Sequence, residues 1–312
     1  MEQHPPERTT GADPVPTWFT EALAAPVRVD EVAVDGVPIR YRAWGEPGDE
    51  GLVLVHGGAA HGHWWDHIGP LLASTGHRVL ALDLSGHGDS GRREAYGLES
   101  WSDEVLAVAE HGGAGAAPVI IGHSMGGMVA LRAALRFGSR LGGIVVIDTP
   151  VRDLSPEELA ARRRQAFGPK RTYPSRERAI RHFRPVPPQP GALPFVVAHL
   201  AEHSVAPVDG GWAWKFDHRV FGGQGIRPEQ LGQVDCRVGL FRAEHGMVPE
   251  AMGQDIHDRM GRIVPVIEIP AAHHHVLIDQ PLALVTALRT LLADWRHSTP
   301  LAERAGGVGA AG

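Results

Sequence analysis

The sequence predicts an α/β fold, in which a mostly parallel, open, twisted sheet carries helices on both faces and a helical cap is inserted into the chain. Short, continuous apolar runs recur along the sequence, as is typical of strands buried on both faces of a parallel sheet. Helix-length segments separate these runs, and such alternation favours an α/β sheet. The alternation stops between residues 152 and 235, which indicates an insertion.

The individual elements follow from local patterns. Two alternating runs flank Asp35-Gly36, a pair typical of a hairpin turn. Buried strands are predicted at six apolar runs, which are residues 52–55, 79–82, 119–121, 144–147, 238–241 and 264–269. The clearest helices are predicted over residues 101–110, 125–136 and 282–295.

These elements divide the chain into five parts. Residues 1–26 are rich in Pro, Glu and Thr and are expected to form a flexible tail. Residues 27–151 and 236–297 form the two halves of the core. Residues 152–235, with clustered prolines and a basic helical piece, are the expected cap or lid. The Gly/Ala-rich residues 298–312 are expected to form a second flexible tail.

Composition narrows the classes of function. The chain has 312 residues, enough for one large core with an insertion. A net charge of −6 predicts no broad basic face, so nucleic acid is not an expected partner. The single cysteine, Cys236, excludes an internal disulfide. We find neither a signal-peptide pattern nor 18 consecutive apolar residues, and therefore expect a cytoplasmic protein that does not enter a membrane. No feature indicates an oligomeric state.

One pentapeptide carries the strongest chemical signal. The motif Gly122-His123-Ser124-Met125-Gly126 lies between an expected strand and an expected helix. A serine on such a sharp turn stands clear at the C-terminal edge of the sheet, and the helix N-terminus favours developing negative charge. An ordinary glycine-rich turn is the alternative, but strand, motif and helix together favour a nucleophilic serine.

Three further motifs follow expected strands in a characteristic order. They are His56-Gly57-Gly58, the turn DLSGHGDS at residues 83–90 and the loop AHHHVLIDQP at residues 272–281. With the serine motif, they make the chain resemble the α/β-hydrolase superfamily over about residues 27–297. The resemblance implies that Ser124 is the nucleophile and that an oxyanion is bound by backbone N–H groups of Met125 and Gly58, with Ala59 as the alternative to Gly58.

The general base is expected in the late histidine loop. His273, His274 and His275 are all candidates there, because each follows the last expected strand. The spacing to Pro281 in the resembled family favours His274, with His275 second.

A serine nucleophile and a histidine base are completed to a catalytic triad by an acidic residue that orients the histidine. This acid is less clear in the sequence. The resemblance implies an aspartate after the run 238–241, but Gly246 stands at that place. Glu244 lies in the same loop, slightly early. Asp148 ends the run 144–147, a position at which some members of the superfamily carry their acid. We prefer Asp148 and keep Glu244 as the alternative; either carboxylate would orient the imidazole.

Aromatic residues predict an apolar substrate pocket beneath the cap. Expected pocket residues are Trp64, Trp65, Trp212, Trp214 and His123, with core packing as the alternative for several of them. His61, His63 and the three consecutive histidines form no recognisable metal motif, so neither a metal nor a cofactor is expected.

The function predicted from these residues is that of a serine hydrolase. It would cleave a carboxylic ester, lactone or thioester of a small to medium apolar substrate through an acyl-enzyme on Ser124. The alternatives are a C–C or amide hydrolase with the same triad, and a non-catalytic relative that binds a small molecule. The glycine at 246 is the one feature that favours the binding protein.

Overall fold

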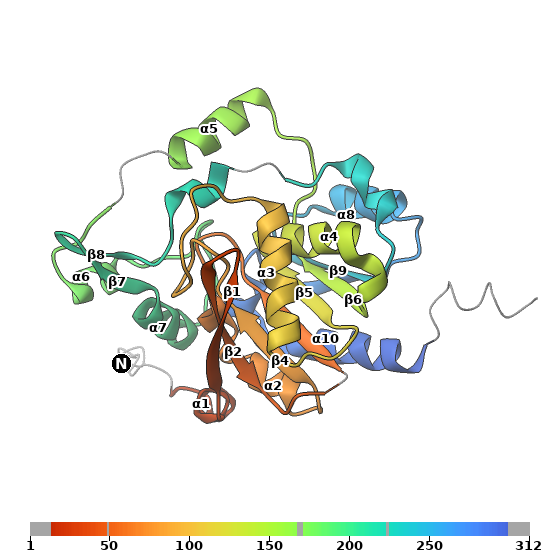
Figure 1. The fold of residues 1–312 in the computed structure, drawn as a ribbon, viewed down its shortest axis with the longest axis horizontal. Coiled ribbons are helices and arrows are strands. Elements are labelled where there is room, and N and C mark those ends of the chain that lie inside the picture. The colour runs from red at the N-terminus through yellow and green to blue at the C-terminus, as the bar shows by residue number, and fades with distance from the viewer. Residues whose placement is uncertain (1–13, 49, 167–170, 223–224, 299–312) are drawn as a thin grey trace, which may run out of the picture.

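A computed structural model describes residues 14–48, 50–166, 171–222 and 225–298. Its central sheet has eight strands in the order β1-β2-β4-β3-β5-β6-β9-β10 (Figure 1). Only the pairs β1–β2 and β2–β4 are antiparallel, so the predicted mostly parallel sheet is confirmed. The strands are β1 Arg28–Val34, β2 Val37–Trp44, β3 Gly51–Val55, β4 Arg78–Leu82, β5 Val119–His123, β6 Gly143–Ile147, β9 Val238–His245 and β10 Val266–His273.

The short strands in the middle of the sheet are buried on both faces, as their continuous apolar sequences predicted. In β3, Val53 and Val55 pack into one core cluster while Leu52 and Leu54 pack into the other. This division follows from the alternation of side chains along a strand. The core therefore lies in two apolar layers, one on each side of the sheet.

Helices cover both faces of the sheet. The first layer receives α3 (Leu98–His111), α4 (Met125–Phe137) and α8 (Glu250–Arg259), and the second receives α1 (Thr17–Ala24), α2 (Gly69–Ala73) and α10 (Pro281–His297). Short pieces complete the core: the 3₁₀ helices η1 (Gly62–Trp65) and η2 (Gly138–Arg140), and α9 (Val276–Asp279). The sheet and its two helical layers form the predicted α/β-hydrolase fold.

The segment between β6 and β9 contributes no strand to the large sheet in its described residues. It contains α5 (Pro156–Ala166), α6 (Arg176–Arg181), α7 (Pro194–His203), η3 (His218–Gly222) and η4 (Pro228–Gln233). It also contains a separate hairpin of β7 (Val205–Val208) and β8 (Gly211–Trp214), which the sequence did not suggest because most of its residues are only partly buried. We call residues 152–235 the cap; its role as a separate unit stays a prediction.

The expected N-terminal tail differs from the structure in one part. Residues 17–24 form α1, in which Phe19 is only 3% exposed. Its ring lies 4.8 Å from that of Phe195 on α7 and 5.7 Å from that of His67. The helix is therefore held by contacts with distant parts of the chain, which a local pattern does not reveal. The remaining tail predictions at residues 1–13 and 299–312 lie outside the described residues.

Among the described residues, no helix is both long and apolar enough to cross a bilayer. The cytoplasmic location stays a prediction.

Candidate active site

Ser124 is the single residue between β5 and α4. Its backbone angles are φ 55° and ψ −117°, a conformation that costs an L-residue on the order of 1–3 kcal/mol and persists only where its surroundings enforce it. The Ser124 N–H donates to the carbonyl oxygen of Ile147 at 2.9 Å, and its own carbonyl accepts from Thr149 Oγ1 at 2.9 Å. Bonds to the neighbouring β6 region thus hold the strained turn.

The glycines of the serine motif are required by close packing. A Cβ atom at Gly122 would lie 2.1 Å from the carbonyl oxygen of Gly126, and one at Gly126 would lie 2.3 Å from that of Val55. Both neighbours are backbone atoms, which cannot move aside without shifting the strand or helix. The motif therefore has a steric basis at this turn.

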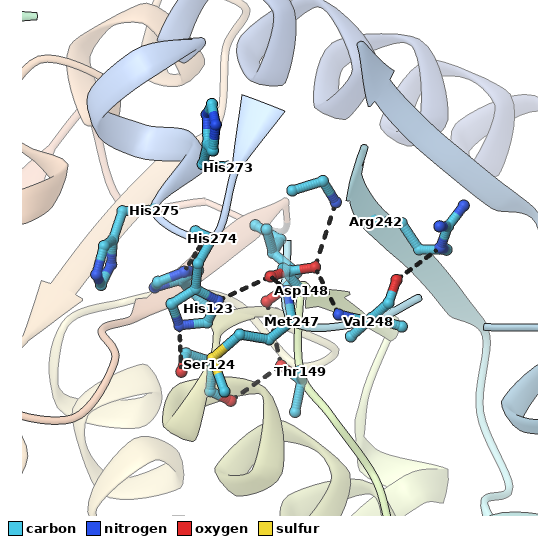
Figure 2. A network of polar contacts seen from close by, with 12 residues as sticks. His123, Ser124, Asp148, Thr149, Arg242, Met247, Val248, His273, His274 and His275 are labelled. Carbon is cyan, nitrogen blue, oxygen red and sulfur yellow. Dashed lines mark hydrogen bonds and ion pairs between the residues drawn. The ribbon is translucent and has the colours of Figure 1, made fainter. Parts of the chain in front are cut away.

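The structure brings Ser124, His274 and Asp148 into one hydrogen-bonded series (Figure 2). His274 Nε2 lies 3.0 Å from Ser124 Oγ, and His274 Nδ1 lies 2.7 Å from Asp148 Oδ2. The three residues follow β5, β6 and β10, whose parallel carboxyl ends meet at one edge of the sheet. Open α/β sheets bind their ligands at this edge.

Asp148 is fully buried and has several backbone donors. Its carboxylate accepts the N–H of Met247 at 2.7 Å, and those of Val248 and Ala243 at 3.3 Å each. These bonds fix the direction of the carboxylate. A carboxylate fixed in this way can accept the Nδ1–H of His274, which leaves the Nε2 lone pair directed at Ser124.

The carboxylate of Asp148 also explains why position 246 is a glycine. A Cβ atom at this position would lie 2.3 Å from Asp148 Oδ1 and 2.4 Å from Oδ2. The carboxylate of Asp148, which follows β6, thus fills the space that any side chain at 246 would need. Glu244, the alternative acid, accepts instead the N–H of Ala271 at 2.7 Å in an exposed position.

The other two histidines of the loop have different surroundings. His273 donates its backbone N–H to Asp279 Oδ2 at 2.7 Å, and in Figure 2 its ring points away from Ser124. The ring of His275 lies 5.3 Å from that of Trp64, and burial together with the neighbouring His274 lowers its pKa to about 3. The structure therefore brings His274, rather than His273 or His275, to Ser124.

His123 holds the histidine loop in place. Its Nε2 lies 2.8 Å from the carbonyl oxygen of His274, which can only accept, so the imidazole donates. Burial lowers the pKa of His123 well below its ordinary value, which keeps the ring neutral. The residue also lines the cavity described below, as the sequence suggested.

The expected oxyanion donors lie beside Ser124. Met125 is the first residue of α4, where an N–H has no carbonyl partner inside the helix. The loop with Gly58 passes so close to the serine turn that a Cβ atom at Gly57 would lie 3.3 Å from Ser124 Cβ. Gly58, Ala59 and Met125 all line the same cavity as Ser124. Their role as donors stays a prediction.

A cavity of about 460 Å³ opens over Ser124 and His274. The core side of its wall includes Trp64, Trp101 and Met128, and the cap side includes Trp214, Phe216 and Phe221. Its lining is mainly apolar, and its size lies within the range of small-molecule sites.

Comparison with known proteins agrees with this fold. A family model described as the alpha/beta hydrolase fold matches residues 51–178. Among solved structures, a thioesterase domain from the curacin biosynthetic pathway superposes with a TM-score of 0.71 over 84% of this chain and 99% of that chain, at 20% identity. The chain therefore has the fold of the α/β-hydrolase superfamily.

The named proteins to which this chain is similar include an esterase. Esterase Rv0045c of Mycobacterium tuberculosis is 27% identical over 258 residues, which cover 77% of this chain and 82% of that protein. Epoxide hydrolase A of the same organism is 33% identical, but over only 122 residues, or 38% of each chain. The esterase is thus matched over most of its length and the epoxide hydrolase over less than half.

Two of the expected pocket tryptophans lie elsewhere in the structure. Trp64 and Trp214 line the cavity, but Trp65 is fully buried in the core layer that contains α2 and α10. Trp212 packs on the small cluster around Tyr173 and Val205. The prediction was wrong for Trp65, which follows Trp64 in η1 and points into the core, and for Trp212, which lies two residues before Trp214 on β8 and outside the cavity wall.

Sequence reasoning missed several residues of the pocket wall. Trp101 was placed in a predicted helix, and Phe221 in the cap was passed over. Phe221 lies so close to the oxyanion loop that a Cβ atom at Gly58 would be 2.9 Å from its ring. The segment 212–221 is rich in aromatic residues, and this was a visible signal in the sequence. Its contact with the oxyanion loop was not visible there.

Proposed function

We propose that this protein is a serine hydrolase that cleaves a carboxylic ester, lactone or thioester of a small to medium apolar substrate. The observation that carries the proposal is the continuous series of hydrogen bonds from Asp148 through His274 to Ser124 Oγ. Such a series allows a hydroxyl to lose its proton as it attacks. The relationship to an esterase supports the same bond type.

In the proposed reaction, Ser124 Oγ attacks the carbonyl carbon while His274 Nε2 takes its proton. The backbone N–H groups of Met125 and Gly58 bind the negative oxygen of the tetrahedral intermediate. His274 returns the proton to the leaving alcohol, the C–O bond breaks, and an acyl-Ser124 ester remains. Water then enters, gives a proton to His274 and releases the acid by the same steps in the second half of the cycle.

The substrate class follows from the wall of the cavity. Tryptophan, phenylalanine and methionine side chains from core and cap surround the space beside Ser124. Such a wall favours apolar acyl or alcohol groups, since burying one methylene contributes about 0.8 kcal/mol. C–C and amide hydrolysis would use the same three residues and are the alternatives within enzyme chemistry.

The direct test combines covalent labelling with turnover. A fluorophosphonate probe should label the wild-type protein, and Ser124→Ala should remain unlabelled while keeping its melting temperature. A series of p-nitrophenyl esters from acetate to octanoate should be hydrolysed, with kcat/KM rising as the acyl chain lengthens to fill the cavity. A folded wild-type protein that neither reacts with the probe nor turns over any ester would instead favour a small-molecule-binding relative.

A further inference from the structure

Three histidines and one aspartate meet where the core contacts the cap. His63 lies in η1, and Asp66 is the first residue after that helix. His199 and His203 lie one turn apart on α7. One potential ligand atom from each of the four residues lies within 4.8 Å of the others. We call these four residues the histidine–aspartate cluster.

The cluster converges on a single oxygen atom. His63 Nδ1 lies 2.7 Å and His199 Nε2 lies 2.9 Å from Asp66 Oδ2. The other oxygen, Oδ1, accepts from Arg42 Nε at 2.6 Å. Arg42 therefore holds the carboxylate in one orientation and leaves Oδ2 to the two imidazoles. An outer partner that orients a carboxylate ligand is a usual part of metal sites.

The fourth member, His203, lies against the other imidazoles. Its ring stacks on that of His63 with centroids 4.0 Å apart, and its centroid is 4.6 Å from that of His199. Histidines at i and i+4 on a helix project from the same face and commonly bind one metal together. Since stacked rings cannot point at one ion, His203 would have to tilt to become a ligand.

The charged side chains at the cluster act on a cation in opposite directions. Asp66 is buried and supplies the carboxylate, and Arg42 Nε lies 2.6 Å from its Oδ1. Arg42 is the cation that opposes binding.

We propose that the histidine–aspartate cluster binds one Zn²⁺ ion, or a similar transition-metal ion, through Asp66, His63 and His199, with His203 as the fourth ligand. The prediction of no metal from sequence would then be wrong for this cluster. Two imidazoles and a carboxylate form a ligand set that zinc favours, and its ligands lie roughly 3.3 Å apart in tetrahedral geometry. The observed N–O distances of 2.7 and 2.9 Å would need to widen by only about half an ångström.

Binding would rearrange protons without any redox change. The ion would take the place of the protons that His63 Nδ1 and His199 Nε2 direct at Asp66 Oδ2, and each ring would carry its proton on the opposite nitrogen. The cost is one weak hydrogen bond, because His63 Nε2 would no longer accept from Arg42 Nη1 at 3.4 Å.

The consequence of binding would be a clamp between core and cap next to the cavity. His61, two residues before His63, bonds Ser204 Oγ at 2.8 Å, and Ser204 directly follows His203. Both His61 and Ser204 line the cavity over Ser124. An ion that ties η1 to α7 would therefore fix one wall of the substrate site.

The test uses the full-length, untagged protein after treatment with EDTA, titrated with Zn²⁺ by calorimetry. We expect one zinc per chain with a Kd in the micromolar range or below, and a melting temperature about 5 °C higher at a free zinc concentration 100 times Kd. X-ray absorption of the zinc complex should show nitrogen and oxygen ligands at about 2.0–2.2 Å.

Variants locate the ion. His199→Gln with His203→Gln keeps polar side chains that can still bond Asp66, and should weaken zinc binding at least 100-fold without changing ester hydrolysis in EDTA. His182→Gln is the matched control, because this cap histidine contacts its own helix at Arg178 and lies outside the cluster. If the double variant unfolds, His203→Gln alone, which leaves both bonds to Asp66, should still weaken binding.

Three results would overturn the proposal. The first is no zinc binding up to millimolar concentration. The second is unchanged binding by the folded His199/His203 variant. The third is loss of binding in His275→Gln, which would place the ion among the other group of neighbouring histidines, His123, His274 and His275.

Discussion

The two walls of the cavity are built in different ways. On the core side, Ser124, Asp148 and His274 each follow a strand of one sheet. Close backbone atoms leave no room for a side chain at the glycines beside Ser124. On the cap side, Trp214 comes from a two-stranded hairpin and Phe221 from a 3₁₀ helix outside that sheet, and Phe216 lies between these two elements. The difference suggests that the core sets the chemistry and the cap sets the choice of substrate. Four substitutions test this division.

The largest effect is expected on the core side from Ser124→Ala. If Ser124 is the nucleophile, its loss should lower kcat for p-nitrophenyl ester hydrolysis by ~10⁶-fold, as in known serine hydrolases. The melting temperature should stay nearly constant, since Oγ does not hold the turn. Steady-state kinetics and a thermal melt measure both; substantial activity in the variant would place the nucleophile elsewhere.

The second effect concerns the acid. Asp148→Asn should lower kcat by ~10⁴-fold, because the amide can hold His274 in the wrong tautomer. Glu244→Gln is the matched control and should cost no more than ~10-fold, since Glu244 bonds Ala271 rather than the histidine. The reverse ranking of these two variants would make Glu244 the acid.

A methyl group at position 246 should have an intermediate effect. In Gly246→Ala the added Cβ would overlap the Asp148 carboxylate, so either the loop or the acid must shift. We expect kcat to fall by ~10²-fold from the displaced triad, with a loss of about 1–3 kcal/mol in the free energy of unfolding.

Chemical denaturation and ester kinetics measure the two consequences of this substitution. Gly48→Ala serves as the control, because a Cβ atom there meets nothing closer than 4.0 Å. If Gly246→Ala kept wild-type kcat, the carboxylate of Asp148 would not need its present position for catalysis.

The smallest effect is expected on the cap side. Trp214→Ala should raise KM for long-chain esters by ~10-fold, through lost apolar contact, and change kcat little. Trp212→Ala, on the same strand and against the same small cluster, should destabilise the protein similarly but leave KM unchanged. Equal changes of KM in both variants would mean that the hairpin acts as a whole.

The sequence predicted the core better than the cap for a physical reason. The central strands β3 and β6 are apolar over their whole length, and the serine motif lies directly between a strand and a helix, so short windows contain the signal. The preference for Asp148 also rested on its place at the end of a buried strand. The structure puts its carboxylate 2.7 Å from His274 Nδ1.

The features that were missed depend on contacts between distant segments. Trp64 and Trp65 are neighbours in η1, yet one lines the cavity and the other is fully buried. Phe19 is buried by residues from η1–α2 and α7, far along the chain. The histidine–aspartate cluster likewise joins η1 to α7; the i, i+4 spacing of His199 and His203 was visible in the sequence, but the partner pair was not.

The contact between Asp148 and Gly246 has a consequence for how such chains diverge. A carboxylate at 148 and a side chain at 246 compete for one volume, so the two positions cannot change independently. Moving the carboxylate from the end of β6 to the loop after β9 would require substitutions at 148 and 246 together. A side chain added at 246 alone would overlap Asp148, and loss of Asp148 alone would leave no carboxylate beside His274. A sequence search that demands an acidic residue after β9 would therefore discard chains of this kind as inactive, whereas a paired rule, glycine at one position and aspartate at the other, would retain them.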